Sequence, residues 1–141
     1  MLSAELDYMK RRICKFLPIL LLALMAAGCE SSSSKNPTTA YSGYYQTGEA
    51  SWYGAEYQGK TTASGEPFDR NAMTAAHKEL PFGTWVQVYN LENGRKIRVR
   101  INDRGPFVEG RIIDLSEKAA DELGMKIAGL AQVGIDIVSG P

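Results

Sequence analysis

An acidic residue directly after a predicted strand is the first feature of this chain that could carry chemistry. Apolar and basic residues alternate over residues 96–101, and the chain then turns through NDRGPF at 102–107. This alternation is typical of a half-buried strand, and Gly-Pro ends it. Asp103 thus has a rigid support at a strand end. It could transfer a proton to a substrate, or simply accept backbone N–H groups within the turn.

Two further titratable residues lie upstream. Glu66 is the acid of a loop of small residues at 61–68, and His77, the single histidine of the chain, ends MTAAH at 73–77. Two acids and a histidine suffice to cleave a glycosidic bond, in which a protonated carboxyl delivers a proton to the leaving oxygen. Glu66 could instead be a solvated loop acid, and His77 a hydrogen-bonded structural residue.

Metal chemistry is not expected. The chain has one histidine and two cysteines, and the first cysteine, Cys14, lies in a predicted signal peptide. A His-rich or Cys-rich metal site therefore cannot be assembled, and we predict neither a metal nor a cofactor.

The elements that must position these side chains are mostly strands. Residues 85–89 and 95–102 flank LENG at 91–94, whose Asn-Gly predicts a hairpin, and 111–115 forms another strand. One helix is predicted from an N-cap at Ser116 to a C-cap at Gly124. The expected core face comprises Val86, Val88, Ile97, Val99, Ile101, Ile112, Ile113, Val133, Ile135 and Ile137. The pattern indicates a small barrel with one helix.

Six ordered motifs resemble the rare lipoprotein A family. They are ASWYG at 50–54, TASGE at 62–66, MTAAH at 73–77, LPFGT at 80–84, NDRGPF at 102–107 and RIIDLS at 111–116. The resemblance covers residues 48–138 and implies a mainly β fold, a six-stranded double-psi β-barrel of the expansin type. It also implies an endolytic peptidoglycan lytic transglycosylase. Its functional acid falls on Asp103, its second acid on Glu66 and its histidine on His77.

In such an enzyme the 6-hydroxyl of N-acetylmuramic acid attacks its own anomeric carbon, so one acid can perform the central proton transfers. The products carry 1,6-anhydro ends. The alternative is a non-catalytic peptidoglycan-binding lipoprotein, because expansin-like barrels can hold a sugar cleft without cleaving the strand.

Aromatic and charged neighbours complete the predicted site. Trp52 and Tyr53 end the first strand and could stack on sugar rings; since alternate strand residues point to opposite faces, we expect Tyr53 to be the one in the cleft. Arg104 is a candidate substrate contact, and it would argue against a raised pKa of Asp103 if its side chain turned back on that acid. We expect Phe107 to plug the turn from beneath and Asp114 to be structural, bonded to Arg104 or to the Asp103 loop.

The first residues predict an exported lipoprotein. Basic residues precede an apolar run at 16–27, too short to span a bilayer, and Gly28-Cys29 follows. Residues 1–28 are predicted to be a signal peptide, whether translation starts at Met1 or Met9, and Cys29 is expected to carry lipid. Residues 29–47 are predicted to form a tether and 48–138 the barrel domain. The expected location is the periplasmic side of a membrane, with the outer membrane favoured.

Charge provides no case for nucleic acid. The whole chain balances 16 basic against 16 acidic residues, and without residues 1–28 the balance is 12 against 14. Non-specific nucleic-acid binding needs a strong basic excess, so none is expected. The predicted partners are peptidoglycan strands and, through Cys29, a membrane, with the protein a monomer.

Overall fold

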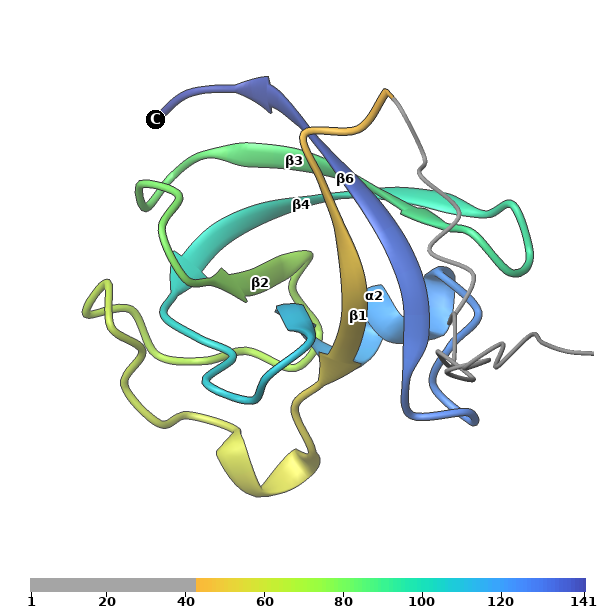
Figure 1. Cartoon of the computed structure of the whole chain (residues 1–141). Helices are drawn as coiled ribbons and strands as arrows, with labels where there is room; N and C mark the ends of the chain where they lie inside the picture. The colour runs from red at the N-terminus through yellow and green to blue at the C-terminus, as the bar shows by residue number, and fades with distance from the viewer. Residues whose placement is uncertain (1–42) are drawn as a thin grey trace, which may run out of the picture. The chain divides into compact units, whose positions relative to one another are not determined.

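A closed barrel of six strands forms the folded part of the chain (Figure 1). The computed structural model describes residues 43–141, so the predicted signal peptide, Cys29 and most of the tether lie outside the described residues. The strand order around the barrel is β1-β5-β2-β4-β3-β6. The strands are β1 (Gln46–Trp52), β2 (Thr74–His77), β3 (Trp85–Asn90), β4 (Lys96–Asp103), β5 (Arg111–Leu115) and β6 (Ala131–Ser139).

Two short helical segments accompany the strands. The 3₁₀ turn η1 (Ala55–Tyr57) follows β1, and helix α2 (Glu117–Glu122) follows β5. A barrel with one α-helix confirms the predicted fold class. β1 begins at Gln46, two residues before the predicted start of the domain. Between residues 43 and 141, no helix is long and apolar enough to cross a membrane.

The hairpin and the helix form where the sequence places them. β3 and β4 pair antiparallel with Val88 opposite Ile97, and Gly94 supplies the positive φ of the turn, at 75°. Helix α2 starts after Ser116, whose hydroxyl accepts the Ala119 N–H, and the chain leaves it through Gly124 at φ 74°. A polar N-cap and a left-handed glycine satisfy the free backbone groups of both helix ends.

The barrel interior is filled by the apolar residues that alternate along the strands. Of the predicted core residues, all but one are buried. Ile137 is the exception, with 44% of its surface exposed. Alternation holds at Ile137, because it pairs with the buried Val86 in phase with the Val88–Ile135 pair, but the residue lies two positions before the end of β6, where Val138 and Ser139 are exposed as well. Ile112 and Ile113 are both buried because the β1–β5 register shifts beside them.

Candidate active site

A row of short side chains crosses four neighbouring strands at one end of the barrel. Ser51 on β1 pairs with Asp114 on β5, Asp114 pairs with Ala76 on β2, and Ala76 pairs with Asp103 on β4. Paired residues project from the same face of a sheet. The two carboxyl groups therefore flank the methyl group of Ala76. The Cα atoms of Asp103 and Asp114 are separated by two strand spacings, or about 9.5 Å.

A bulge brings Asp103 onto this row. Ala75 lies opposite Ile101, and the next residue, Ala76, lies opposite Asp103, so Asn102 is the extra residue of β4. Under strict alternation Asp103 would share the face of Ile101, which is completely buried in the core. A one-residue bulge reverses the direction in which the later side chains of the strand face. Asp103 thus leaves the core face and stays partly exposed.

Both carboxylate oxygens of Asp103 are engaged. Oδ1 accepts the backbone N–H of Ala63 at 2.8 Å and that of Arg104 at 2.9 Å. Oδ2 accepts the hydroxyl of Tyr53 at 3.2 Å. The expectation that this acid binds backbone N–H groups in the turn is therefore correct for Oδ1, while Oδ2 is held by a side chain 50 residues away in sequence. This fixes the direction in which Oδ2 faces.

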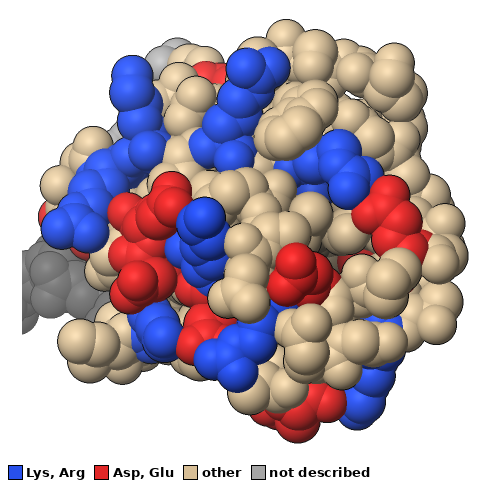
Figure 2. Space-filling view, turned by 180° about the vertical axis from the view of Figure 1, so that it is seen from behind, with Lys and Arg blue, Asp and Glu red and all other residues tan. Residues whose placement is uncertain are grey.

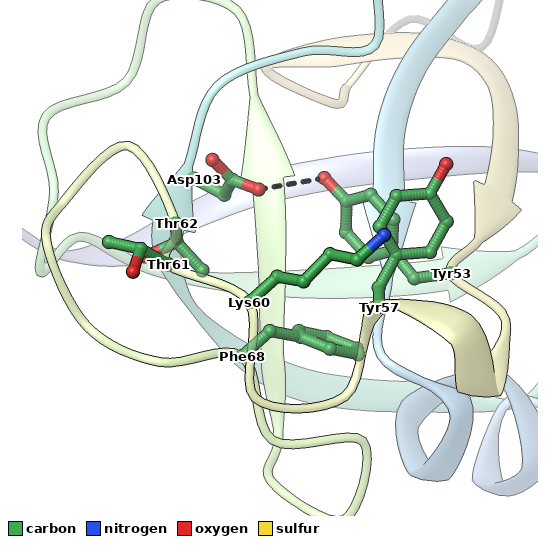
Figure 3. A pocket seen from close by; sticks show the side chains of 7 residues that line it. All are labelled: Tyr53, Tyr57, Lys60, Thr61, Thr62, Phe68 and Asp103. Carbon is green, nitrogen blue, oxygen red and sulfur yellow. Dashed lines mark hydrogen bonds between the residues drawn. The ribbon is translucent and has the colours of Figure 1, made fainter.

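A small pocket opens beside Oδ2 (Figure 3). Its space, which is open to solvent, amounts to about 240 Å³, and it is lined by Tyr53, Tyr57, Lys60, Thr61, Thr62, Phe68 and Asp103. The Tyr53 ring lies 5.2 Å from that of Phe68, edge to face, and 5.4 Å from that of Tyr57. The Lys60 ammonium lies 4.8 Å from the centre of the Tyr57 ring. Aromatic faces beside a carboxylate suit a sugar ring with a polar edge.

Tyr53 acts in this pocket as a hydrogen-bond donor. Its partial burial raises the pKa of the phenol far above the ordinary value, and the nearby carboxylates of Asp103 and Asp114 add to this effect. The hydroxyl therefore keeps its proton at any pH the protein meets. Trp52, the preceding residue, packs against the core instead. The structure thus places these two aromatic residues as strand alternation predicts.

Asp114 is the site residue to which the sequence interpretation gave too little weight. Its carboxylate accepts the Ser51 hydroxyl and makes no bond to Arg104. Burial raises the pKa of Asp114, and the charge of Asp103 raises it further, against the opposing effects of Ser51 and Arg111. A buried carboxyl group whose pKa is raised in part by a second carboxylate is a frequent feature of catalytic sites. The signal in the sequence was the position of Asp114, a charged residue between the core residues Ile113 and Leu115.

Glu66 lies at the same end of the barrel but does not touch Asp103. Its carboxylate receives both terminal nitrogens of Arg100, at 2.9 and 2.8 Å, and the Asn102 amide at 3.3 Å. The hydrogen bonds from Arg100 chiefly, with help from Asn102, lower the pKa of Glu66. The side chain is neither a freely solvated loop acid nor among the residues that line the pocket.

His77 is buried, and both of its ring nitrogens lie within hydrogen-bond distance of other groups. Its Nδ1 accepts the backbone N–H groups of Glu79 and Leu80, at 3.1 and 3.0 Å, and Nε2 lies 2.9 Å from the Gln46 side-chain oxygen. This pattern assigns the ring proton to Nε2. Burial is the main cause of a lowered pKa. Among residues 43–141, the ring forms no hydrogen bond to Asp103 or Glu66. Its contacts are those expected of a hydrogen-bonded structural histidine.

Arg104 turns away from the carboxylate of Asp103. Its guanidinium stacks over the Phe82 ring at 3.9 Å and donates to the carbonyls of His77 and Leu80. It thereby ties the turn after β2 to the turn after β4. Phe107 is 85% exposed, so the expectation that it plugs the turn is wrong. The backbone bonds of Asp103 and the Arg104 side chain hold the turn without an apolar plug.

Basic and acidic side chains interleave on the face shown in Figure 2. Residues 43–141 contain no group of three or more His, Cys, Asp or Glu side chains arranged to hold a metal ion.

Comparisons with known proteins agree on one family. The family described as "Lytic transglycolase" matches residues 45–135. A "Probable endolytic peptidoglycan transglycosylase RlpA" from Synechocystis is 57% identical over 91 residues, which are 64% of this chain and 28% of that protein. The "Endolytic peptidoglycan transglycosylase RlpA" of Campylobacter jejuni is 49% identical over 72% of this chain and 37% of its own length. The one from Vibrio cholerae is also 49% identical, over 74% of this chain and 38% of its own.

Solved structures show the same fold. The apo expansin of Clavibacter michiganensis superposes with a TM-score of 0.53 and 28% identity, over 67% of this chain and 50% of that one. A papain inhibitor from Streptomyces superposes with a TM-score of 0.50 and 25% identity, over 67% of this chain and 97% of its own. The matches to these three RlpA proteins span less than two fifths of their length.

Proposed function

Because this chain belongs to the RlpA family of double-psi β-barrel proteins, we propose that it is a lytic transglycosylase that cleaves the glycan strands of peptidoglycan. The bond cut lies between N-acetylmuramic acid and N-acetylglucosamine. The relatives carry this activity in their names, and the family match at residues 45–135 covers β1 to β5 and the first part of β6.

One observation carries the proposal: the Asp103 carboxyl forms part of the wall of an aromatic pocket and is held by three donors. Ala63 and Arg104 bind Oδ1, and Tyr53 binds Oδ2. Tyr53, Tyr57 and Phe68 supply rings on which the apolar face of a pyranose can pack. A carboxyl that is fixed beside a bound sugar meets the geometric requirement for a general acid.

The reaction needs two proton transfers and no water. Protonated Asp103 gives its proton to the glycosidic oxygen as the bond from that oxygen to the anomeric carbon breaks. The 6-hydroxyl oxygen of the same N-acetylmuramic acid then bonds to the anomeric carbon, and its proton returns to Asp103. The products are a 1,6-anhydro end and a free 4-hydroxyl, and the carboxyl is restored. Asp114, across Ala76, is the second carboxyl of the site.

The substitution Asp103→Asn tests this role. The oxygen of the new amide can still accept the Ala63 and Arg104 N–H groups, so the turn should persist. Loss of general acid catalysis should lower the rate by roughly 10² to 10⁴. The assay incubates the protein with purified glycan strands and measures 1,6-anhydro ends by mass spectrometry. A folded Asp103→Asn protein with near-normal turnover would refute the assignment.

A binding protein without catalysis is the second candidate, and the 28% identity to an expansin favours it. The same incubation separates the two. Anhydro ends indicate a transglycosylase, and hydrated reducing ends a hydrolase. Strands that stay intact but sediment with the protein indicate a binder.

We propose further that the barrel is held at a membrane by lipid on Cys29, facing the periplasm, with the outer membrane as the favoured location. The support is the sequence: basic residues, the apolar run at 16–27 and Gly28-Cys29. Acyl chains contribute about 0.8 kcal/mol per buried CH₂, so two or three of them hold a protein firmly.

A further inference from the structure

The geometry points to a positioning role for Glu66 and Arg100: we propose that they form a clamp that fixes the 61–68 loop so that its Ala63 N–H reaches the Asp103 carboxylate. Arg100 then becomes a residue on which turnover depends, and Glu66 acts through the loop rather than on the sugar. The inference rests on the proposed cleavage activity.

The clamp itself is a two-pronged ion pair between the loop and β4. The Nη1 and Nη2 atoms of Arg100 donate to the two carboxylate oxygens of Glu66, at 2.9 and 2.8 Å, and Asn102 adds a third donor. Parallel bonds of this kind fix orientation as well as distance. The side chains of Glu66 and Arg100 are 45% and 31% exposed, so solvent screens the charge attraction and its contribution is mainly geometric.

The backbone of the loop transmits this restraint. The Glu66 carbonyl accepts both the N–H and the hydroxyl of Thr62, each at 2.8 Å, and Gly65 N–H closes the turn on the Thr62 carbonyl at 3.0 Å. Ser64 N–H donates to the Asn102 carbonyl at 3.2 Å. Ala63 is thus at the tip of a closed turn whose base is tied to β4.

The tip of this turn meets the reacting group. Ala63 N–H donates to Asp103 Oδ1 at 2.8 Å, and Thr61 and Thr62 form the adjoining pocket wall (Figure 3). Glu66 itself does not line that pocket. Both of its oxygens already accept Arg100, and one of them also accepts Asn102, so its carboxylate is oriented toward β4.

Four variants test the clamp on purified glycan strands: Glu66→Gln, Arg100→Gln, both together, and the exchanged pair Glu66→Arg with Arg100→Glu. Misplacement by about 1 Å can cost about 10²-fold in rate. We therefore expect each single variant to lower kcat by about 10- to 100-fold, with KM less affected. The double variant should be no worse than the poorer single one, since partners in one interaction are not additive. The exchanged pair should recover at least about tenfold.

Arg98→Gln is the matched control. Arg98 lies two residues before Arg100 on β4, and its guanidinium is over the Trp85 ring at 5.4 Å, away from Glu66. This variant should turn over at the wild-type rate. Hydrogen exchange of the Ala63 amide gives a readout that does not depend on cleavage: it should accelerate in both single clamp variants and return toward wild type in the exchanged pair.

The outcomes separate a clamp from a catalytic acid. Full activity in Arg100→Gln beside an inactive Glu66→Gln, or an exchanged pair that protects Ala63 yet stays inactive, would overturn the clamp and give Glu66 a chemical role. If the exchanged pair does not fold, Arg100→Lys decides, because lysine keeps the charge but not the two-pronged contact. Unchanged Ala63 exchange in both Arg100→Lys and Arg100→Gln would also refute it. If the wild type cleaves nothing, the proposed function fails, and the exchange data still decide the clamp.

Discussion

Removing one hydroxyl group from the pocket should slow the enzyme by a predictable factor. Tyr53→Phe deletes the donor to Asp103 Oδ2 and keeps the ring that packs on Phe68 and Tyr57. A hydrogen bond to a charged group contributes about 1.5 to 3 kcal/mol, which corresponds to about 10- to 150-fold in rate. The bond is 3.2 Å long, at the weak end for O–H···O contacts. We therefore expect a loss of about 10- to 30-fold in kcat.

The measurement is the initial rate of anhydro-end formation at several concentrations of glycan strands. Tyr89→Phe is the control, because Tyr89 packs against Tyr44, outside the pocket. It should leave kcat and the urea midpoint unchanged, whereas Tyr53→Phe should stay folded with a somewhat lower urea midpoint, because it loses one hydrogen bond. A folded Tyr53→Phe protein with wild-type kcat would show that the hydroxyl does not help position Asp103. A loss beyond about 10³-fold would mean that Tyr53 transfers a proton, which its raised pKa argues against.

Three other perturbations have defined outcomes. Burial raises the pKa of Asp114 above 3.8, so the protonated carboxyl stabilises the fold in acid, and this stability is lost as pH rises through the folded pKa. Asp114→Asn should therefore raise the urea midpoint at pH 7 but not below pH 3.8. It should also lower turnover at least about tenfold. Because burial lowers the pKa of His77 below 6.5, the unfolded chain takes up a proton first on acidification. Stability should fall below pH 6.5 by at most about 1.4 kcal/mol per pH unit, and an NMR titration of this single histidine should show that more than half of the rings are neutral at pH 6.5. Cys29→Ser should move the protein from the membrane fraction to the soluble fraction in a fractionation blot, because the lipid is the proposed anchor.

Each of these predictions has an outcome that contradicts it. Equal urea midpoints for Asp114→Asn and wild type across the range from about pH 3 to pH 7 would exclude a buried acid that prefers its proton. A His77 ring that titrates at 6.5 would mean that its bonds to Gln46 and the 79–80 backbone are open in solution. Retention of Cys29→Ser in membranes would exclude the lipid anchor.

The local pattern of the sequence was enough to predict most strands, the hairpin, the helix caps and the core. These features depend on neighbours in sequence: alternation sets which strand residues are buried, Asn-Gly closes the β3–β4 turn, and Ser116 caps α2. The resemblance of six motifs added the barrel fold and the importance of Asp103. Local reasoning failed at Ile137 and Phe107, which are exposed although apolar: Ile137 lies near the end of β6, and Phe107 lies in a turn held by hydrogen bonds.

The arrangement of the site was decided only by the tertiary structure. The bulge at Asn102 turns Asp103 out of the core, the barrel closure sets Asp114 two strands away, and Tyr53 reaches Asp103 across 50 residues. Glu66 and His77 lie near the acid, but their polar atoms bind Arg100 and Gln46. A sequence records which groups are present. Which lone pairs are left for a substrate depends on partners distant in the chain, and only closure of the barrel brings those partners into hydrogen-bond reach.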